Sequence, residues 1–338
     1  MNSGKRLRVG LFGTLGSLIA IYFVLSQVNM AELGAVFSRI RWNWVELCAL
    51  LLVFGLLARA WRWQLLLNGA LPLVRSFTIM NVSYLVNGLL PLRMGEVVRA
   101  FLATRAEPPV PVFRSLSTII VERLLDLLAV VGLVLIALAS GPLPDQIRAA
   151  AVFLGPLALA GFVVLVILSQ RRTLVHRLLA ALSGRFALLR RWRVDRLVDH
   201  FLDGLAPLAK PRALGLALFS TAVSWGFSVV AGYVLMYAVW DTASWSTTAL
   251  FIAAASLAIA VPAVPGNVGT YELSILLALG ATGYGEPESA ASAFAILVHA
   301  VNLVVYAIVG VVSFLYEGVS LEQLSRGVQQ FNSSQSQG

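Results

Sequence analysis

Long apolar runs constrain this chain more than any other feature of its sequence. Six of these runs are roughly 20 residues long, the length that a helix needs to cross about 30 Å of hydrocarbon. They show no alternation of polar and apolar residues, which disfavours transmembrane strands. Only 12% of the 338 residues are charged, against about 25% in soluble domains. The sequence therefore predicts an all-α polytopic membrane protein and excludes a large soluble enzyme.

The predicted full spans are 9–26, 44–66, 115–139, 149–169, 212–238 and 290–316. They form one transmembrane domain over residues 1–320, followed at 321–338 by a polar tail that we expect to be largely disordered. The first run could be a signal peptide, but its length and the lack of a small-x-small cleavage site favour an uncleaved span. Trp61 and Trp63 are interpreted as part of an aromatic belt at one end of the span 44–66.

The basic loop 170–212 sets the expected orientation. It carries ten Lys/Arg against three Asp, so the positive-inside rule places it, and with it both termini, in the cytoplasm of a bacterial inner membrane. Apolar residues from Val194 to Leu205 recur there at helical spacing, and this amphipathic segment is predicted to contact anionic inner-leaflet lipids. Topology alone explains the basic charge, so no nucleic-acid partner is expected.

A weak internal repeat interrupts two shorter apolar stretches, 77–90 and 247–261. The first copy reads NGLLPLRMGE and the second reads VPAVPGNVGTYE. Both contain Pro-x-x-x-Gly and lead into a short second helix that opens with a carboxylate. Proline removes a backbone donor and glycine admits unusual backbone angles, so each segment should break its helix. The predicted helix breaks are Pro91, Gly95, Pro265, Gly266 and Gly269.

Backbone groups freed by such breaks are tolerated at membrane depth only inside protein or along a wet cavity. Two re-entrant helical hairpins are the simplest solution. Counting spans makes each half a span, a hairpin and a span, over about 44–139 and 212–316, with the halves inverted. Inverted repeats with broken helices are typical of alternating-access transporters. The alternative is a chance pattern in two ordinary kinked helices.

Charged residues cluster where lipid is expected, although Asp, Lys or Arg near a span centre costs about 2.5–3.5 kcal/mol. Glu122 and Asp126 share a helical face, so the acids of that span should pair with arginines of the first hairpin and leave one guanidinium free as an anion site. A purely structural salt-bridge network or snorkelling at the interface is the alternative. The candidates for headgroup binding or transport are Arg93, Glu96, Arg99, Glu122, Arg123, Asp126, Asn267 and Glu272, with His299 and Asn302 secondary.

Metal and nucleotide chemistry find little support in the sequence. Cys48 is the single cysteine, no Cys/His cluster suggests a metal site, and no Gly-rich stretch ends in Lys-Ser/Thr. Cys48 is interpreted as a small apolar packing residue. We predict no metal, no cofactor and no catalytic residue.

The segments NGLLPLRMGEVVRAFLATR, VERLLDL and VPGNVGTYE resemble the flippase-like, lysylphosphatidylglycerol-synthase transmembrane-region family. The resemblance covers nearly the whole chain. It implies a module that moves a modified lipid between leaflets beside an aminoacyl-phosphatidylglycerol synthase, with related modules in polyprenyl-phosphate sugar and hopanoid pathways. These residues include no counterpart of the soluble aminoacyl-transfer domain, so aminoacylation by this chain alone is not expected.

Three functions are therefore open. The first is a translocator of an anionic phosphate-bearing lipid, such as a phospholipid or polyprenyl phosphate. The second is an intramembrane lipid-modifying enzyme that uses Glu96, Glu122 or Asp126 as acid or base, although no nucleophile or metal set accompanies them. The third is a non-catalytic membrane subunit that assists a lipid-modifying transferase.

Overall fold

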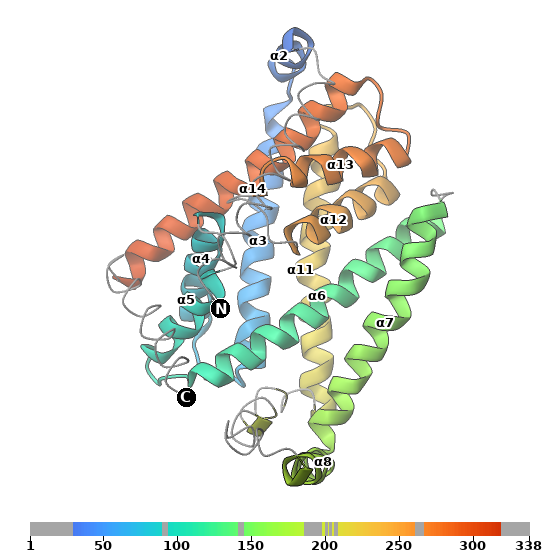
Figure 1. The fold of residues 1–338 in the computed structure, drawn as a ribbon. Helices are drawn as coiled ribbons and strands as arrows, with labels where there is room; N and C mark the ends of the chain where they lie inside the picture. The colour runs from blue at the N-terminus through green and yellow to red at the C-terminus, as the bar shows by residue number, and fades with distance from the viewer. Residues whose placement is uncertain are drawn as a thin grey trace, which may run out of the picture.

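The computed structural model describes residues 30–89, 94–140, 145–185, 209–260 and 267–318, together with residues 198, 199, 202 and 205. Within these ranges the chain forms eleven helices and no strand, which confirms the all-helical prediction (Figure 1). The predicted span 9–26, the tail 321–338 and the site candidates Pro91, Arg93, Pro265 and Gly266 lie outside the described residues.

Three described helices are both long and apolar enough to cross a membrane: α3 (Trp42–Leu66), α11 (Pro211–Met236) and α14 (Glu288–Glu317). They coincide with three of the predicted spans. The predicted spans 115–139 and 149–169 fall within α6 (Val112–Ser140, 29 residues) and α7 (Asp145–Gln170, 26 residues). The total of six spans stays a prediction.

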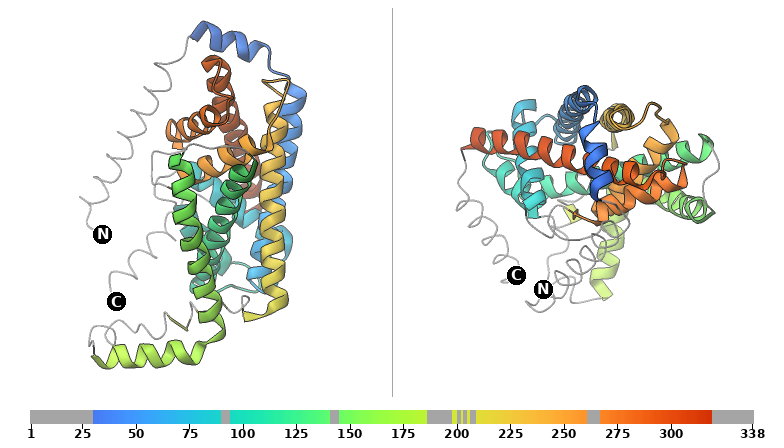
Figure 2. Two further views of the ribbon diagram at one scale, coloured as in Figure 1. Left: turned by 90° about the vertical axis from the view of Figure 1, so that its right-hand side faces the viewer. Right: turned by 90° about the horizontal axis from the view of Figure 1, so that it is seen from above.

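Helices α3 and α11 form the most closely packed helix pair of the bundle. They run antiparallel and pack most extensively against each other, and they stand side by side when seen from above (Figure 2). Leu52 and Leu56 of α3 join Ala231 and Leu235 of α11 in one buried apolar cluster that also holds Cys48, consistent with the packing role expected of that cysteine. Lipid is as apolar as the core, so close packing rather than the hydrophobic effect holds such helices together.

Two pairs of short helices lie on opposite sides of the molecule (Figure 1). The first pair is α4 (Leu73–Leu89) and α5 (Met94–Thr104), and the second is α12 (Trp245–Ala260) and α13 (Thr270–Ala281). At 1.5 Å per residue these helices are about 17 to 26 Å long, too short to cross 30 Å of hydrocarbon alone. Within each pair the two helices pack against each other. The predicted breaks thus separate helices that fold back together.

The helix contacts of the two halves match. Helix α4 packs on α14 as α12 packs on α6, α5 packs on α6 as α13 packs on α14, and α3 packs on α4 as α11 packs on α12. Each pair of short helices therefore lies against a long helix of the other half. Two copies of one helical unit would give this set of contacts. That the two copies are inverted across a membrane stays a prediction.

Three helices lie outside these units: α7, which packs on α6, and two shorter helices, α2 and α8. Helix α2 (Met30–Ser38) packs on α14, whereas α8 (Arg172–Arg185) lies crosswise at the end of α7 (Figure 2). Most of the predicted amphipathic segment lies outside the described residues. Its Leu202 and Leu205 are buried against Leu66 and Leu125 of the bundle, so part of its apolar face packs on protein. Contact with inner-leaflet lipids stays a prediction.

The close approach of α5 to α4 predicts a steric requirement at Gly95. A Cβ on Gly95 would lie 2.0 Å from the Ser83 carbonyl oxygen, whereas a Cβ on Gly88 meets nothing within 4 Å. Gly95→Ala should therefore destabilise the fold by at least the roughly 1–3 kcal/mol of an overpacked core. Gly88→Ala should be neutral or stabilising, because alanine is the better helix former. Thermal unfolding of both variants in detergent measures the difference, and equal midpoints would contradict the close approach.

Candidate functional site

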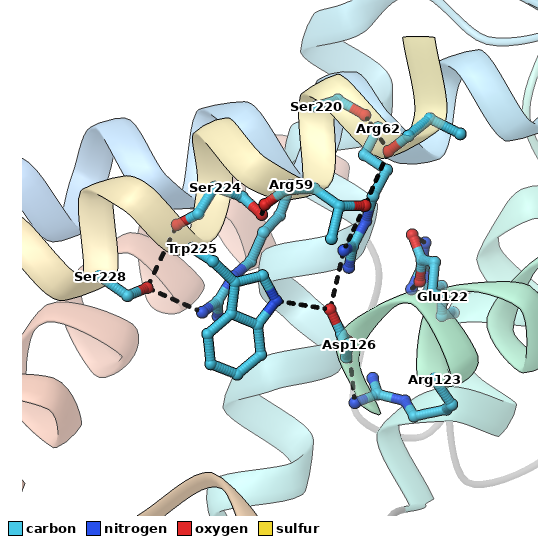
Figure 3. Close-up of polar contacts among 12 residues, drawn as sticks. Arg59, Arg62, Glu122, Arg123, Asp126, Ser220, Ser224, Trp225 and Ser228 are labelled. Carbon is cyan, nitrogen blue, oxygen red and sulfur yellow. Dashed lines mark hydrogen bonds and ion pairs between the residues drawn. The ribbon is translucent and has the colours of Figure 1, made fainter. Parts of the chain in front are cut away.

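The described charged candidates of the first half converge where α5 and α6 meet α3 and α11. Helix α6 presents Glu122, Arg123 and Asp126, and the other helices supply their partners (Figure 3). The i, i+4 spacing places Glu122 and Asp126 on one face, as the sequence predicted. Their arginine partners on other helices come from α5 and α3, and the sequence predicted only the one on α5.

Arg99 and Glu122 form the most deeply buried ion pair of this group. Arg99 Nη1 and Nη2 donate to Glu122 Oε2 and Oε1 at 2.6 and 3.0 Å, and each side chain is only 2% exposed. The guanidinium lies 3.9 Å from the ring centroid of Trp63, and Trp63 Nε1 donates to Thr118 Oγ1 at 3.1 Å. The pair fastens α5 to α6, so its direct role is to position the broken hairpin.

The structure corrects the interpretation of Trp63. It is fully buried rather than part of an aromatic belt, and it forms the wall against which Arg99 lies. An aromatic face is a favourable surface for a guanidinium. A tryptophan near a span end can thus be buried against a charged side chain instead of lying at the interface.

Glu96, Arg123 and Asp126 form the partly exposed edge of the cluster. Arg123 lies 3.4 Å from Glu96 Oε1 through Nε and 3.6 Å from Asp126 Oδ2 through Nη1. Their side chains are 40% (Arg123), 26% (Glu96) and 22% (Asp126) exposed. Charged atoms that are neither buried in protein nor compatible with hydrocarbon must face water or lipid headgroups.

Helix α3 contributes two arginines that sequence analysis missed. Arg62 Nη1 donates to Asp126 Oδ1 at 2.7 Å and to Thr221 Oγ1 at 3.3 Å, and Trp225 Nε1 donates to the same Asp126 oxygen at 3.1 Å. Arg59 donates instead to two neutral hydroxyls, Tyr306 Oη and Ser228 Oγ, at 3.3 Å each. The signal was present, since two arginines in an apolar span need explaining, but the flanking tryptophans made them look interfacial.

The second half holds a different pair at the corresponding place. Glu272 Oε1 lies 2.5 Å from His299 Nδ1, which joins α13 to α14 as Arg99 and Glu122 join α5 to α6. The Gly269 N–H donates to Glu272 Oε2 at 2.7 Å. Gly269 has a φ of 86°, a conformation that favours glycine. Glu272 thus both caps its half-helix and fixes it to α14.

The remaining candidates of the second half make local contacts. Asn302 Nδ2 donates to the Val298 carbonyl of its own helix at 2.8 Å, and Asn267 adopts a positive φ of 55° at the start of the turn. The ring of Tyr271 stacks on His299 at 4.5 Å between centroids. Among the described residues, no group of three His, Cys, Asp or Glu side chains could hold a metal ion.

These features define a class: a multi-pass helical membrane protein with paired short helices and a charged cluster inside the bundle. The chain belongs to the lysylphosphatidylglycerol synthase TM region family, whose sequence profile matches residues 9–310. The resemblance inferred from the sequence is thereby confirmed.

One curated relative extends the comparison. The chain is 29% identical over 272 residues to a protein of Haloferax volcanii named glycosyltransferase AglD, an alignment that covers 71% of this chain and 43% of the relative. The chain thus spans less than half the length of that relative. No solved structure matches this chain.

The Arg99–Glu122 pair yields a stability prediction. Glu122→Leu should destabilise the protein by about 3–5 kcal/mol, because it leaves a buried guanidinium without its counter-charge. The double variant Arg99→Leu/Glu122→Leu should recover most of that loss, since it removes both charges. Thermal unfolding in detergent of both single variants and the double variant completes the cycle. Additive effects would show that the two side chains do not act as a pair.

Proposed function

We propose that this chain is a lipid translocator that moves an anionic, phosphate-bearing lipid between the leaflets of a bacterial inner membrane. The Glu96–Arg123–Asp126 edge carries the proposal. It is a partly exposed charged surface beside the break of the first hairpin. A headgroup that crosses the bilayer needs such a surface, because hydrocarbon solvates neither its phosphate nor the side chains that carry it.

The net charge of the cluster supports an anionic cargo. Its described members comprise four arginines, Arg59, Arg62, Arg99 and Arg123, against three carboxylates, Glu96, Glu122 and Asp126. One positive charge is therefore in excess where the dielectric constant is low. A lipid phosphate would balance it, and arginine binds phosphate through two parallel hydrogen bonds.

The matched helix contacts support movement between leaflets. We infer that the two pairs of short helices are re-entrant hairpins that enter from opposite sides, with the basic loop 170–212 and both termini in the cytoplasm. In such inverted repeats one unit can rock against the other and expose a central site alternately to each side. The deeply buried Arg99–Glu122 and Glu272–His299 pairs would keep each hairpin attached to its long helix during that motion.

The names of the similar proteins favour a second candidate function. One names a lysylphosphatidylglycerol synthase and the other a glycosyltransferase. A non-catalytic membrane partner for a transferase that acts on lipid would fit both names. An intramembrane enzyme has less support, because Glu96, Glu122 and Asp126 are each already held in an ion pair with arginine.

Lipid exchange by the purified chain tests the proposal. We expect phosphatidylcholine vesicles containing the protein and fluorescent phosphatidylglycerol to lose inner-leaflet fluorescence when dithionite is added, and protein-free vesicles to lose only outer-leaflet fluorescence. Arg123→Gln should slow exchange at least about tenfold, because a charge-assisted hydrogen bond contributes roughly 1.5–3 kcal/mol.

The matched control is Arg105→Gln. Arg105 is exposed near the end of α5 and lies over Phe101, so its loss should leave exchange unchanged. Inertness of the wild-type chain toward phosphatidylglycerol and polyprenyl phosphate alike would leave only the role of a transferase partner.

A further inference from the structure

We infer that Arg59 is a phosphate-binding subsite of the translocation path, placed between the two halves of the molecule, where it receives the lipid phosphodiester after the Arg123 edge. The inference rests on the proposed function and names the residue that holds the cargo inside the bundle. It concerns an arginine with no ion-pair partner among the described residues.

The partners of Arg59 distinguish it from its neighbours. Arg62 and Arg99 reach carboxylate oxygens at 2.7 and 2.6 Å, whereas Arg59 reaches two hydroxyls at 3.3 Å. Charge-assisted hydrogen bonds are usually about 2.7–2.9 Å long. These long contacts to neutral oxygens give Arg59 no carboxylate hydrogen-bond partner of its own, and a charge held inside protein without a direct partner is costly. A bound phosphate would supply both the charge and shorter hydrogen bonds.

The position of Arg59 is internal by helix geometry. It lies seven residues, or about 10 Å, before the end of α3 at Leu66, and α3 is about 37 Å long. Both of its hydrogen bonds are partly buried. Snorkelling to the nearer interface would turn the guanidinium toward Leu66, yet its two hydrogen bonds run to α11 and α14 instead. The side chain is therefore held across the bundle.

Arg59 also joins the two halves of the molecule. It belongs to α3, while its partners Ser228 and Tyr306 belong to α11 and α14 of the second half. Tyr306 stacks on Tyr84 of α4 at 5.7 Å between ring centroids. The Tyr306 hydroxyl accepts from Arg59 and keeps its own proton, which it can donate to a phosphate oxygen. A phosphate here would contact both units that must move relative to each other.

Further polar side chains lie on both sides of Arg59, one set toward each hairpin. Toward the first hairpin, Ser228 lies one helical turn from Trp225, which donates to Asp126 at the Arg123 edge (Figure 3). Toward the second hairpin, Tyr306 lies on the same helix as His299, the partner of Glu272. Arg59 is thus the cationic group between the charged edge of the first half and the buried pair of the second.

Exchange assays on variants of Arg59 test the subsite. In phosphatidylcholine vesicles, Arg59→Gln should slow exchange of fluorescent phosphatidylglycerol about tenfold or more, and Arg59→Lys should slow it less, since lysine keeps the charge but not the paired donors. Tyr306→Phe should slow exchange a few-fold. Arg105→Gln again serves as the matched control. Native mass spectrometry should show fewer bound phosphatidylglycerol molecules on Arg59→Gln than on wild type.

The outcomes separate this inference from the proposed function. Wild-type exchange with an unchanged rate in Arg59→Gln and Tyr306→Phe would overturn the subsite and leave the translocator intact. A wild-type chain that exchanges no lipid would overturn both. Displacement of bound phosphatidylglycerol by inorganic phosphate would assign Arg59 to a soluble anion and overturn the lipid subsite. If Arg59→Gln does not fold, Arg59→Lys and Tyr306→Phe decide the matter, because both keep the bulk of the side chain.

Discussion

The structure depends on one constraint: a charge placed inside a membrane protein must find its partner within the same bundle. The Arg99–Glu122 pair meets that constraint most fully, with two short hydrogen bonds, almost no exposure and the face of Trp63 beneath the guanidinium. Because its two residues lie on α5 and α6, the pair also fixes where the first broken hairpin lies. The same ion pair therefore neutralises both buried charges and positions α5 against α6.

Local patterns in the sequence predicted much of this arrangement. Apolar runs of spanning length give long helices, and a proline–glycine break ends a helix because it removes a donor and admits a turn. The spacing of Glu122 and Asp126 placed both on one face. The described residues confirm that α4 and α5, and likewise α12 and α13, are separate helices packed together. Each of these features follows from residues that are close together in the sequence.

The partners of the charged residues could not be predicted in the same way. Arg62 and Asp126 are 64 positions apart, and Trp225 and Asp126 are 99 apart, so only the packing of three helices brings them together. Arg59 is a single charge in a long apolar run, and the nearby Trp61 and Trp63 suggest an interface, so its immediate sequence does not predict a position across the bundle. A search for every charge inside a predicted span, without regard to its flanks, would have found it.

The two halves share their helix arrangement but not their chemistry. An arginine and a glutamate join α5 to α6, whereas a histidine and a glutamate join α13 to α14. The first half supplies the described arginines of the cluster, and the second supplies hydroxyl acceptors and an indole donor from α11 and α14. A site built in this way belongs to neither half alone. In the proposed translocator, motion of one unit against the other would change the polar groups around a bound anion while the cations stay in place.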